Sequence, residues 1–485
     1  MSEGIKNKAI KGAGWSLADN IFNQGITFLV GLVLARLLTP EEYGLIGIIT
    51  IFIALFNSIV DSGFSNALIR KNDAKSIDYD TVFITNMVLS IFMFFAMFFS
   101  APAIGAFFNQ PQLEPLTKVM ASIVVINAVA IIPRTLFVKR VDFKTQTKIS
   151  LIASLTSGIV GIVMAICGFG VWSLVAQQIL RQFLNSVFLW IWAKWYPQFH
   201  FSIKSFKDLF GFGWKLLVSG LIDTVWKEIY QVVIGKYYSA ETLGQYTRAQ
   251  QFGTIFSSNL TSVVQRVSYP VLSEIQDDKM ILKYAYKKVI KVTMLVAFCC
   301  MLGLAAIAKP MILVLIGDQW LPAVPFLQIL CFNMMLYPLH AINLNMLQVQ
   351  GRSDLFLKLE IIKKAIAVVP LVLGIFVGIY WMLWSSVITG FIAYYLNAYY
   401  SGKFLDYSIW EQIKDIFPSF AVASVMAIMV LCLTLINLSS CLLLMLQLIV
   451  GILLVIILCE ISRLDSYIEV KDIAVTYLNK LRNGK

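Results

Sequence analysis

The sequence predicts an all-α protein that crosses a membrane many times. Of its 485 residues, 59% are hydrophobic and only 14% are charged, whereas a soluble globular protein carries about 25% charged residues. The mean hydropathy of +0.79 agrees with this composition. Apolar stretches of about 20 residues, long enough to cross a bilayer as a helix, recur from Trp15 to Ile461 with few breaks. We therefore expect a polytopic helical membrane protein without a separate soluble domain.

Fourteen transmembrane helices account for the apolar stretches. The first is too long for the core of a signal peptide and lacks a small-residue cleavage site, so we interpret it as a retained span. Very short connections, "GFG" and "GIY", join the fifth span to the sixth and the eleventh to the twelfth. The expected spans are residues 13–38, 43–68, 80–101, 116–138, 148–168, 171–195, 209–237, 242–268, 285–308, 322–349, 355–377, 379–400, 412–435 and 440–461.

The distribution of basic residues predicts the orientation of the chain. Loops on the cytoplasmic side of a membrane protein are enriched in Lys and Arg. With the N-terminus inside, the inner segments hold 29 Lys and Arg residues and the outer segments hold 4. One wrong span would invert every later loop and remove this contrast. We therefore expect both termini in the cytoplasm, and the net charge of +12 mainly reflects topology and does not indicate nucleic-acid binding.

An internal duplication relates the two halves of the predicted bundle. The loop "ARLLTPEEYG", residues 35–44, resembles "GKYYSAETLG", residues 235–244, and "KRVDF" resembles "GRSDL" further along each half. Each repeat contains an even number of spans, so both enter the membrane from the same side. We expect two pseudo-symmetric six-helix lobes, with a substrate path between them as in transporters built from such repeats. The predicted parts are residues 1–200 for the N-lobe, 201–402 for the C-lobe, and 403–485 for two further helices and a cytoplasmic tail.

Motifs of enzymes and metal sites are missing from the sequence. The seven cysteines are scattered through apolar segments without ligand spacing, which is typical of small hydrophobic residues. There are two histidines, His200 and His340, and no HExxH, GxSxG or P-loop pattern. The sequence therefore predicts a non-enzymatic protein without a bound metal or organic cofactor.

Polar side chains recur on one face of several predicted spans, because residues at i, i+3, i+4 and i+7 of a helix lie on the same side. In the first span this face carries Asn20, Asn23, Gln24 and Thr27, and the repeat maps it onto Gly220, Asp223, Thr224 and Lys227. Two further stripes contain Gln178, Arg181, Gln182 and Asn185 in the sixth span, and Arg248, Gln251, Ser258, Ser262 and Gln265 in the eighth. The candidate substrate-binding residues are Asn23, Gln24, Gln178, Arg181, Lys227 and Arg248.

Charges inside the spans need partners or water, since each costs about 2.5–3.5 kcal/mol at the centre of a lone helix. Asp223 and Lys227 lie four residues apart, so a structural ion pair and an ion-driven switch are both open for them. Arg181 has no acid in its own span and needs a partner from elsewhere or an anionic ligand. The cations in the spans outnumber the acids, which suits an anionic cargo. The candidate ion-coupling acids are Asp61, Asp223 and Glu228.

Several segments resemble a known transporter family. "GAGWSL…LARLLTPEEYGLIGI", "GQYTRAQQF", "RVSYPVLSEIQDD" and "RVDFKTQTKISL" are similar to Wzx-type polysaccharide and O-antigen flippases (lipopolysaccharide biosynthesis proteins) of the multidrug/oligosaccharidyl-lipid/polysaccharide exporter superfamily. The resemblance implies a bilobed fourteen-helix transporter of the cytoplasmic membrane with a basic central cavity. It also implies alternating access, driven by an H⁺ or Na⁺ gradient, for an undecaprenyl-pyrophosphate-linked oligosaccharide.

Two other functions remain open at this stage. A drug–cation antiporter of the same fold would favour acids and aromatic residues in its cavity, against which Arg181, Lys227 and Arg248 argue. A membrane-embedded polysaccharide polymerase or ligase would carry a large outer loop with catalytic groups, and the predicted outer loops are short. The expected partners are the lipid-linked oligosaccharide, membrane lipids and other polysaccharide-assembly membrane proteins.

Overall fold

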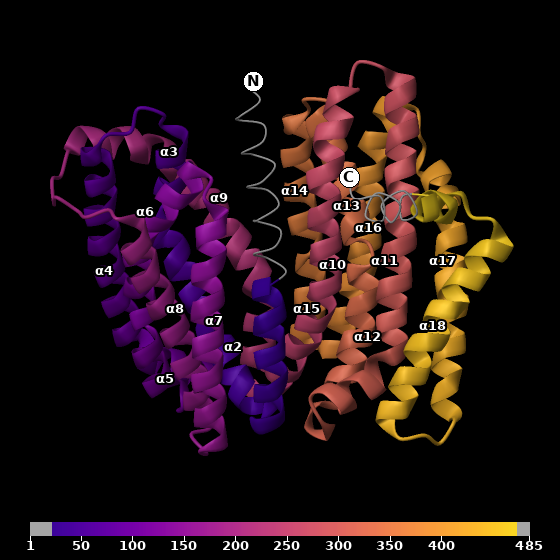
Figure 1. Ribbon diagram of the computed structural model, residues 1–485, viewed down its shortest axis with the longest axis horizontal. Coiled ribbons are helices and arrows are strands. Elements are labelled where there is room, and N and C mark those ends of the chain that lie inside the picture. Colours follow the sequence, from indigo (N-terminus) through magenta and orange to yellow (C-terminus); the bar gives the residue numbers. More distant parts are fainter. Residues whose placement is uncertain (1–21, 473–485) are drawn as a thin grey trace, which may run out of the picture. The chain divides into compact units, whose positions relative to one another are not determined.

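The computed structural model describes residues 22–472, which form helices joined by loops, and this part of the chain contains no β-strand (Figure 1). Residues 13–21 of the first expected span, with Asn20, and the tail beyond residue 472 lie outside the described residues. After the apolar helix Phe22–Leu37, the chain forms α2 (Pro40–Asp61), α3 (Phe64–Arg70), α4 (Ser76–Phe108), α5 (Leu113–Met120), α6 (Ser122–Arg140), α7 (Phe143–Ile166), α8 (Val171–Ala193) and α9 (Ile203–Tyr237).

The second half of the chain continues the helical pattern. Its elements are α10 (Ala240–Glu274), α11 (Lys279–Leu315), the 3₁₀ helix η1 (Asp318–Trp320), α12 (Ala323–Met334), α13 (Tyr337–Val349), α14 (Ser353–Ile366), α15 (Val368–Phe376), α16 (Ile379–Leu405), α17 (Ile409–Cys432), the 3₁₀ helix η2 (Leu433–Leu435) and α18 (Ser440–Ser462). Within the described residues, each expected span therefore coincides with one helix or with two consecutive helices. The prediction of an all-α polytopic protein is confirmed.

Ten of the described helical segments are long and apolar enough to cross a membrane. The helix Phe22–Leu37 is shorter within the described range. Helices α8 and α10 carry the polar stripes that the sequence shows, and α14 and α15 are separate short helices. The number of membrane crossings, predicted as fourteen, stays a prediction.

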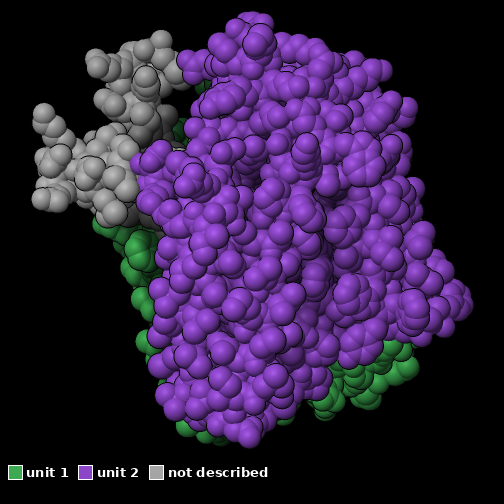
Figure 2. All heavy atoms as spheres, turned by 90° about the vertical axis from the view of Figure 1, so that its right-hand side faces the viewer, with its two compact units in different colours: residues 1–244 green, residues 245–485 purple. Residues whose placement is uncertain are grey.

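The chain divides into two compact units, residues 1–244 and 245–485 (Figure 2). Helix α9, expected to open the C-lobe, groups with the first unit, where it packs against α2, α3 and α4. Its contact with the start of α3 depends on glycine: Gly63 adopts a φ of +71°, and a β-carbon there would lie 2.5 Å from the carbonyl oxygen of Gly213. Position in a sequence repeat thus does not dictate which unit a helix packs into.

Equivalent caps start the two helices that follow the duplicated loop. In α2 the side chain of Thr39 accepts a hydrogen bond from the backbone N–H of Glu42, and the Glu42 carboxylate accepts one from the N–H of Thr39. In α10 the Ser239 hydroxyl accepts from the N–H of Thr242 at 3.0 Å. Such caps satisfy backbone donors that the first turn leaves unpaired. The matching caps support the duplication inferred from the sequence.

In the second unit, lysines on α11 recur every four residues and face acidic residues on and next to α17. Lys287 lies 2.7 Å from Glu411 and 3.2 Å from Asp415, and Lys291 lies 3.5 Å from Asp415. Further ion pairs in this ladder are Lys279–Asp406, Lys283–Glu411, Lys291–Asp465 and Lys288–Glu469. The ladder ties α17 and the segment after α18 to α11, at the end of the helices predicted to be cytoplasmic.

Candidate functional site

Arg181 lies near the middle of α8, on the same face as Gln178, one turn earlier. Both side chains are half-buried. Helix α8 packs closely against α7 because small residues face it: a β-carbon on Gly161 would lie 3.0 Å from Cβ of Gln177. Within the described part of the chain, no hydrogen bond or ion pair reaches the Arg181 guanidinium. Among the described residues, neither its own helix nor a neighbouring helix therefore supplies an acid that pairs with this cation.

A second cation of the first unit has an acidic neighbour that the sequence did not reveal. Arg134 of α6 interacts electrostatically with Asp61 at the end of α2, and Asp61 also accepts a hydrogen bond from Ser65. The two residues lie far apart in sequence, so no helical spacing connects them. Asp61, predicted to take part in ion coupling, thus lies beside a fixed positive charge.

Asn23 contributes to packing between helices of the first unit. Its amide Nδ2 donates to the Ser150 hydroxyl at 2.6 Å, and the Ser154 hydroxyl donates to its Oδ1 at 3.3 Å. Ser150 and Ser154 are one turn apart on α7. One turn further, a β-carbon on Gly158 would lie 2.6 Å from a methyl of Val30. Both amide groups of Asn23 are thus satisfied by α7, whereas Gln24 beside it is exposed.

The charged side chains of α9 are more exposed to solvent than the members of a buried ion pair would be. Asp223 and Lys227 are exposed, and Glu228 is half-buried and accepts a hydrogen bond from Gln231 at 2.6 Å. Among the described ion pairs none joins Lys227 to Asp223, so the intrahelical pair considered for these residues is not formed. Such a pair contributes only about 0.2–0.5 kcal/mol on an exposed helix face. Lys227 interacts electrostatically with the neighbouring Glu228 instead.

Arg248 lies in a different environment from Arg181. It is only 5% exposed, near the start of α10, and its Nη1 donates to Gln251 Oε1 at 2.5 Å. Its guanidinium carbon lies 5.6 Å from the ring centre of Trp320 in η1. Next to it, Gln245 donates to the backbone oxygen of Gln319 at 2.7 Å. The structure thus places Arg248 in the packing between α10 and η1, and contact with cargo stays a prediction for this residue.

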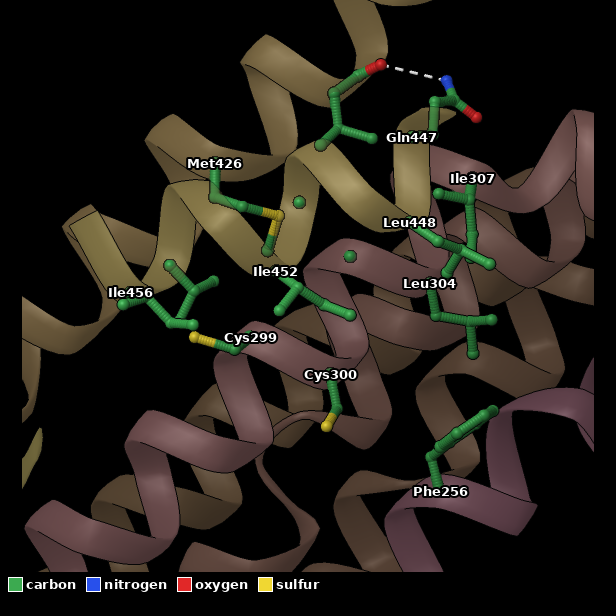
Figure 3. A pocket seen from close by; sticks show the side chains of 14 residues that line it. Phe256, Cys299, Cys300, Leu304, Ile307, Met426, Gln447, Leu448, Ile452 and Ile456 are labelled. Carbon is green, nitrogen blue, oxygen red and sulfur yellow. Dashed lines mark hydrogen bonds between the residues drawn. The ribbon is translucent and has the colours of Figure 1, made fainter. Parts of the chain in front are cut away.

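A pocket of about 390 Å³ opens in the second unit between α11, α17 and α18 (Figure 3). Its wall is almost entirely hydrocarbon and sulfur, with Leu304, Ile307 and Ile452 among the lining residues. The one amide in the wall, that of Gln447, donates to the backbone oxygen of Val430 at 2.9 Å. A pocket of this chemistry accommodates an apolar chain and offers nothing to a charged group.

The described residues contain no group of three or more His, Cys, Asp or Glu side chains able to hold a metal ion. The cysteines are present as free thiols. The polar groups of the described spans include amides, hydroxyls, guanidiniums, the ammonium of Lys227, the imidazole of His340 and carboxylates. This set suits binding and release of a polar or anionic solute.

The fold and these polar spans define a multi-pass helical membrane protein with the architecture of known lipid and drug transporters. The structure of the lipid II flippase MurJ, in an inward closed conformation, matches with a TM-score of 0.75 at 14% identity, covering 92% of this chain and 98% of that one. An inward-facing multidrug-resistance MATE transporter matches with a TM-score of 0.60 at 15% identity, covering 79% and 94%. At these identities the likeness concerns the fold.

The sequence comparison is more specific. A family model described as polysaccharide biosynthesis protein matches residues 33–325, more than half of the chain, so the chain belongs to that family. It is 26% identical to the teichuronic acid biosynthesis protein TuaB of Bacillus subtilis, over 72% of this chain and 73% of that protein. It is also 26% identical to the lipopolysaccharide biosynthesis protein WzxC of Escherichia coli, over 76% of each. The family resemblance expected from the sequence is thereby confirmed.

Proposed function

We propose that this protein moves a lipid-linked oligosaccharide from the inner to the outer leaflet of the cytoplasmic membrane, for the assembly of a cell-surface polysaccharide. Its family membership supports a place in polysaccharide biosynthesis. Its fold is that of transporters, among them a lipid II flippase. The cargo we propose is an oligosaccharide on an undecaprenyl pyrophosphate carrier, with both termini of the protein in the cytoplasm.

The observation that carries this proposal is that the Arg181 guanidinium forms no ion pair with a described residue. A guanidinium without an ion pair in the described part of the chain, halfway along an apolar helix, would cost several kcal/mol if it faced lipid. Water or an anion must therefore reach it. A pyrophosphate supplies the planar, charged acceptors that a guanidinium binds best. Gln178 on the same face adds an amide for sugar or phosphate oxygens.

Two other features support a cargo that is charged at one end and apolar at the other. Lys227 is exposed at membrane depth on α9 and adds a second cation. The pocket between α11, α17 and α18 has the apolar wall that a prenyl chain requires (Figure 3). A small cationic drug would be repelled by Arg181 and Lys227, which argue against that alternative.

We further propose that an H⁺ or Na⁺ gradient drives the transport cycle, with Asp61, Asp223 and Glu228 as the acidic groups that respond to it. Asp223 and Glu228 lie on the same helix as Lys227, so binding of a cation there would alter the charge that the cargo meets. Asp61 has Arg134 as its neighbour and would act in the first unit. Other polysaccharide-assembly membrane proteins are the partners we propose.

Deletion of the gene tests the proposal. In its absence the lipid-linked oligosaccharide should accumulate. In spheroplasts it should stay inaccessible to an impermeant probe, because the sugars are added on the inner leaflet and are not moved to the outer one. A plasmid copy of the wild-type gene should restore surface polymer, whereas Arg181→Ala should not. Normal export of surface polymer by the deletion strain, or accumulation of long polymer on the inner face, would contradict the flippase function.

A further inference from the structure

The connection between α8 and α9, residues 194–202, exposes large apolar side chains. Each of the following is at least half exposed: Tyr196, Phe199, Phe201 and, as the first residue of α9, Ile203. The connections at residues 71–75 and 275–278, predicted to lie on the same side of the membrane, contain no aromatic residue. Exposed aromatic rings therefore distinguish this connection from others on its side.

Side chains of α4 hold the connection in place. The backbone N–H of Gln198 donates to Oδ1 of Asp80 at 3.1 Å, and that of Ser202 donates to the Thr81 hydroxyl at 3.1 Å. Asp80 and Thr81 are both fully buried. In addition, Nδ1 of His200 lies 3.9 Å from Oδ2 of Asp80. The connection is thus attached to the start of α4 at two backbone positions, and its exposed side chains project from a fixed support.

Two of the aromatic rings use only part of their surface for packing. The ring of Phe199 lies 6.3 Å from that of Phe83 on α4, and the ring of Phe201 lies 6.2 Å from that of Phe206 on α9. Even so, Phe199 is 70% exposed. Its φ of +56° is one that bulky side chains rarely adopt. The fold therefore presents this ring outward, although a more ordinary backbone conformation would cost less.

Exposed cations flank the aromatic residues. Lys194 precedes them, and Lys204 and Lys207 follow in the first turns of α9. None of these three ammoniums belongs to an ion pair of the described residues. Asp208 is the one acid between residues 194 and 208. The surface of this segment is therefore both apolar and basic.

The backbone of the connection indicates its surroundings. Of the N–H groups of residues 195–202, those of Gln198 and Ser202 have partners within the described part of the chain. The others need water or lipid headgroups, because the hydrocarbon of a bilayer offers no acceptor. Water alone would leave several large apolar side chains exposed, which marks interaction sites. The membrane–water interface satisfies both requirements, and aromatic residues are enriched there.

We propose that residues 194–207 form a membrane-surface anchor whose partner is an anionic phospholipid of the leaflet predicted to be cytoplasmic. The aromatic rings and Ile203 insert at the level of the headgroups, and the three ammoniums contact lipid phosphates. Anionic lipids give a membrane surface a negative potential that attracts nearby lysines. The inference goes beyond the proposed transport function, because this lipid contact does not involve the cargo.

The anchor is continuous with the helix that carries the charged stretch. In the first two turns of α9 the rings of Phe206 and Phe210 stack with their centres 5.5 Å apart. Both rings also contact Phe64 at the start of α3, at 6.0 and 6.1 Å. Fixing residues 194–207 at the membrane surface therefore sets the depth at which α3 and α9 begin.

Fluorescence of the full-length protein in nanodiscs made only of phospholipid tests the depth of the anchor. Phe199→Cys and, separately, Tyr196→Cys carry a fluorophore in a background without the native cysteines. The control is Asp73→Cys, on the exposed connection at residues 71–75. We expect a nitroxide near the lipid headgroups to quench the two anchor labels more strongly than the control label, and aqueous iodide to do the reverse. Anchor labels that iodide reaches as readily as the control would overturn the proposal, since the rings would then face water or need a protein partner.

A second comparison tests the lysines. Nitroxide-labelled phosphatidylglycerol and nitroxide-labelled phosphatidylcholine are compared as quenchers of the Tyr196→Cys label in otherwise identical phosphatidylcholine nanodiscs. We expect a quenching ratio above unity in favour of phosphatidylglycerol. The ratio should fall to unity in the triple variant Lys194→Gln, Lys204→Gln, Lys207→Gln.

The matched control removes the same charge elsewhere on the side predicted to be cytoplasmic. It replaces three other exposed lysines, as Lys148→Gln, Lys358→Gln and Lys414→Gln, and should keep the ratio. A ratio of unity with all lysines present, or an equal loss in both triple variants, would overturn the assignment to anionic lipid. Neither measurement uses cargo, so both outcomes are independent of the flippase proposal.

Added salt provides a test that needs no lysine substitution. Salt screens charges at a membrane surface, so the preference for phosphatidylglycerol should weaken in high salt, while the headgroup nitroxide should still quench the Tyr196→Cys label. A preference that salt leaves unchanged would show that the ammoniums do not cause it and would overturn their assigned role.

Discussion

Gly44 and Gly244 occupy equivalent places in the two sequence repeats and make reciprocal contacts. A β-carbon on Gly44 would lie 1.7 Å from the carbonyl oxygen of Ala240, and one on Gly244 would lie 1.8 Å from the carbonyl oxygen of Pro40. The first turns of α2 and α10 therefore touch backbone to backbone. Only glycine permits this approach at both positions, and the matching contacts agree with the duplication of this loop in the sequence.

Replacing either glycine by alanine should separate these two helix starts. We expect Gly44→Ala and Gly244→Ala each to lower the free energy of unfolding by about 1–3 kcal/mol or more, because the added methyl must displace backbone. Thermal unfolding in detergent measures the effect. Gly211→Ala is the matched control, since Gly211 also lies in a helix and a β-carbon there would meet nothing within 4 Å. Equal stability of all three variants would refute the close contact.

Arg181 should matter for transport and not for folding. Arg181→Ala should reduce polymer export roughly ten- to hundred-fold, because each lost hydrogen bond to a charged group is worth about 1.5–3 kcal/mol. Arg181→Lys should recover part of the activity, since it keeps the charge without the planar fork. The amount of inserted protein should stay unchanged. Lys414→Ala, which removes an exposed cation of α17, serves as the control, and unchanged export by Arg181→Ala would contradict the proposed cargo contact.

Arg248 should behave differently from Arg181. Its guanidinium is buried between Gln251 and Trp320, so Arg248→Ala removes a hydrogen bond and a cation–π contact worth together about 2–4 kcal/mol. We expect a lower unfolding temperature and less protein in the membrane. Trp320→Leu should have a similar effect, and the double variant should lose less than the sum of the two. A stable Arg248→Ala protein that fails in export would instead favour the role in cargo binding that the sequence suggested.

The predicted orientation can be tested by labelling introduced cysteines in a background without the native ones. Cysteines at Glu41 and Gln319 should react with an impermeant reagent from outside, and those at Asp73 and Lys204 should react only after permeabilisation. All four positions are exposed, so a difference in reactivity reports the side of the membrane. Reaction of Asp73→Cys or Lys204→Cys in intact cells would invert the topology.

The first rung of the lysine ladder should be sensitive to acid. The hydrogen bond from Lys279 lowers the pKa of Asp406 below its ordinary value. A carboxylate with a lowered folded-state pKa contributes stability that is fully present above its unfolded pKa of about 3.9, and this contribution disappears as the pH falls through the folded-state pKa. Lys279→Ala should therefore be less stable than the wild type at neutral pH and equally stable in strong acid. A difference that persists in acid would assign the effect to packing.

The arrangement of charge shows how far helical spacing alone can predict a site. The sequence correctly singled out Arg181 as a cation without an acid in its own helix, because that property depends on one helix only. It left open whether Asp223 and Lys227 form an ion pair or a switch, because the rotamers of two exposed side chains depend on their surroundings. It did not indicate the electrostatic interaction of Arg134 with Asp61, since no local pattern relates α6 to α2.

Composition and periodicity determined that this chain is a helical membrane protein, where its helices lie and that its halves are repeated. These properties follow from the length and polarity of each segment, because the bilayer acts on every helix separately. The tertiary structure decided which helices pack together and which polar groups are used up in that packing. It assigned α9 to the first unit, placed Arg248 against Trp320 and brought Arg134 near Asp61. Such contacts depend on side-chain shape at surfaces where two helices meet, and one segment of sequence does not contain that information.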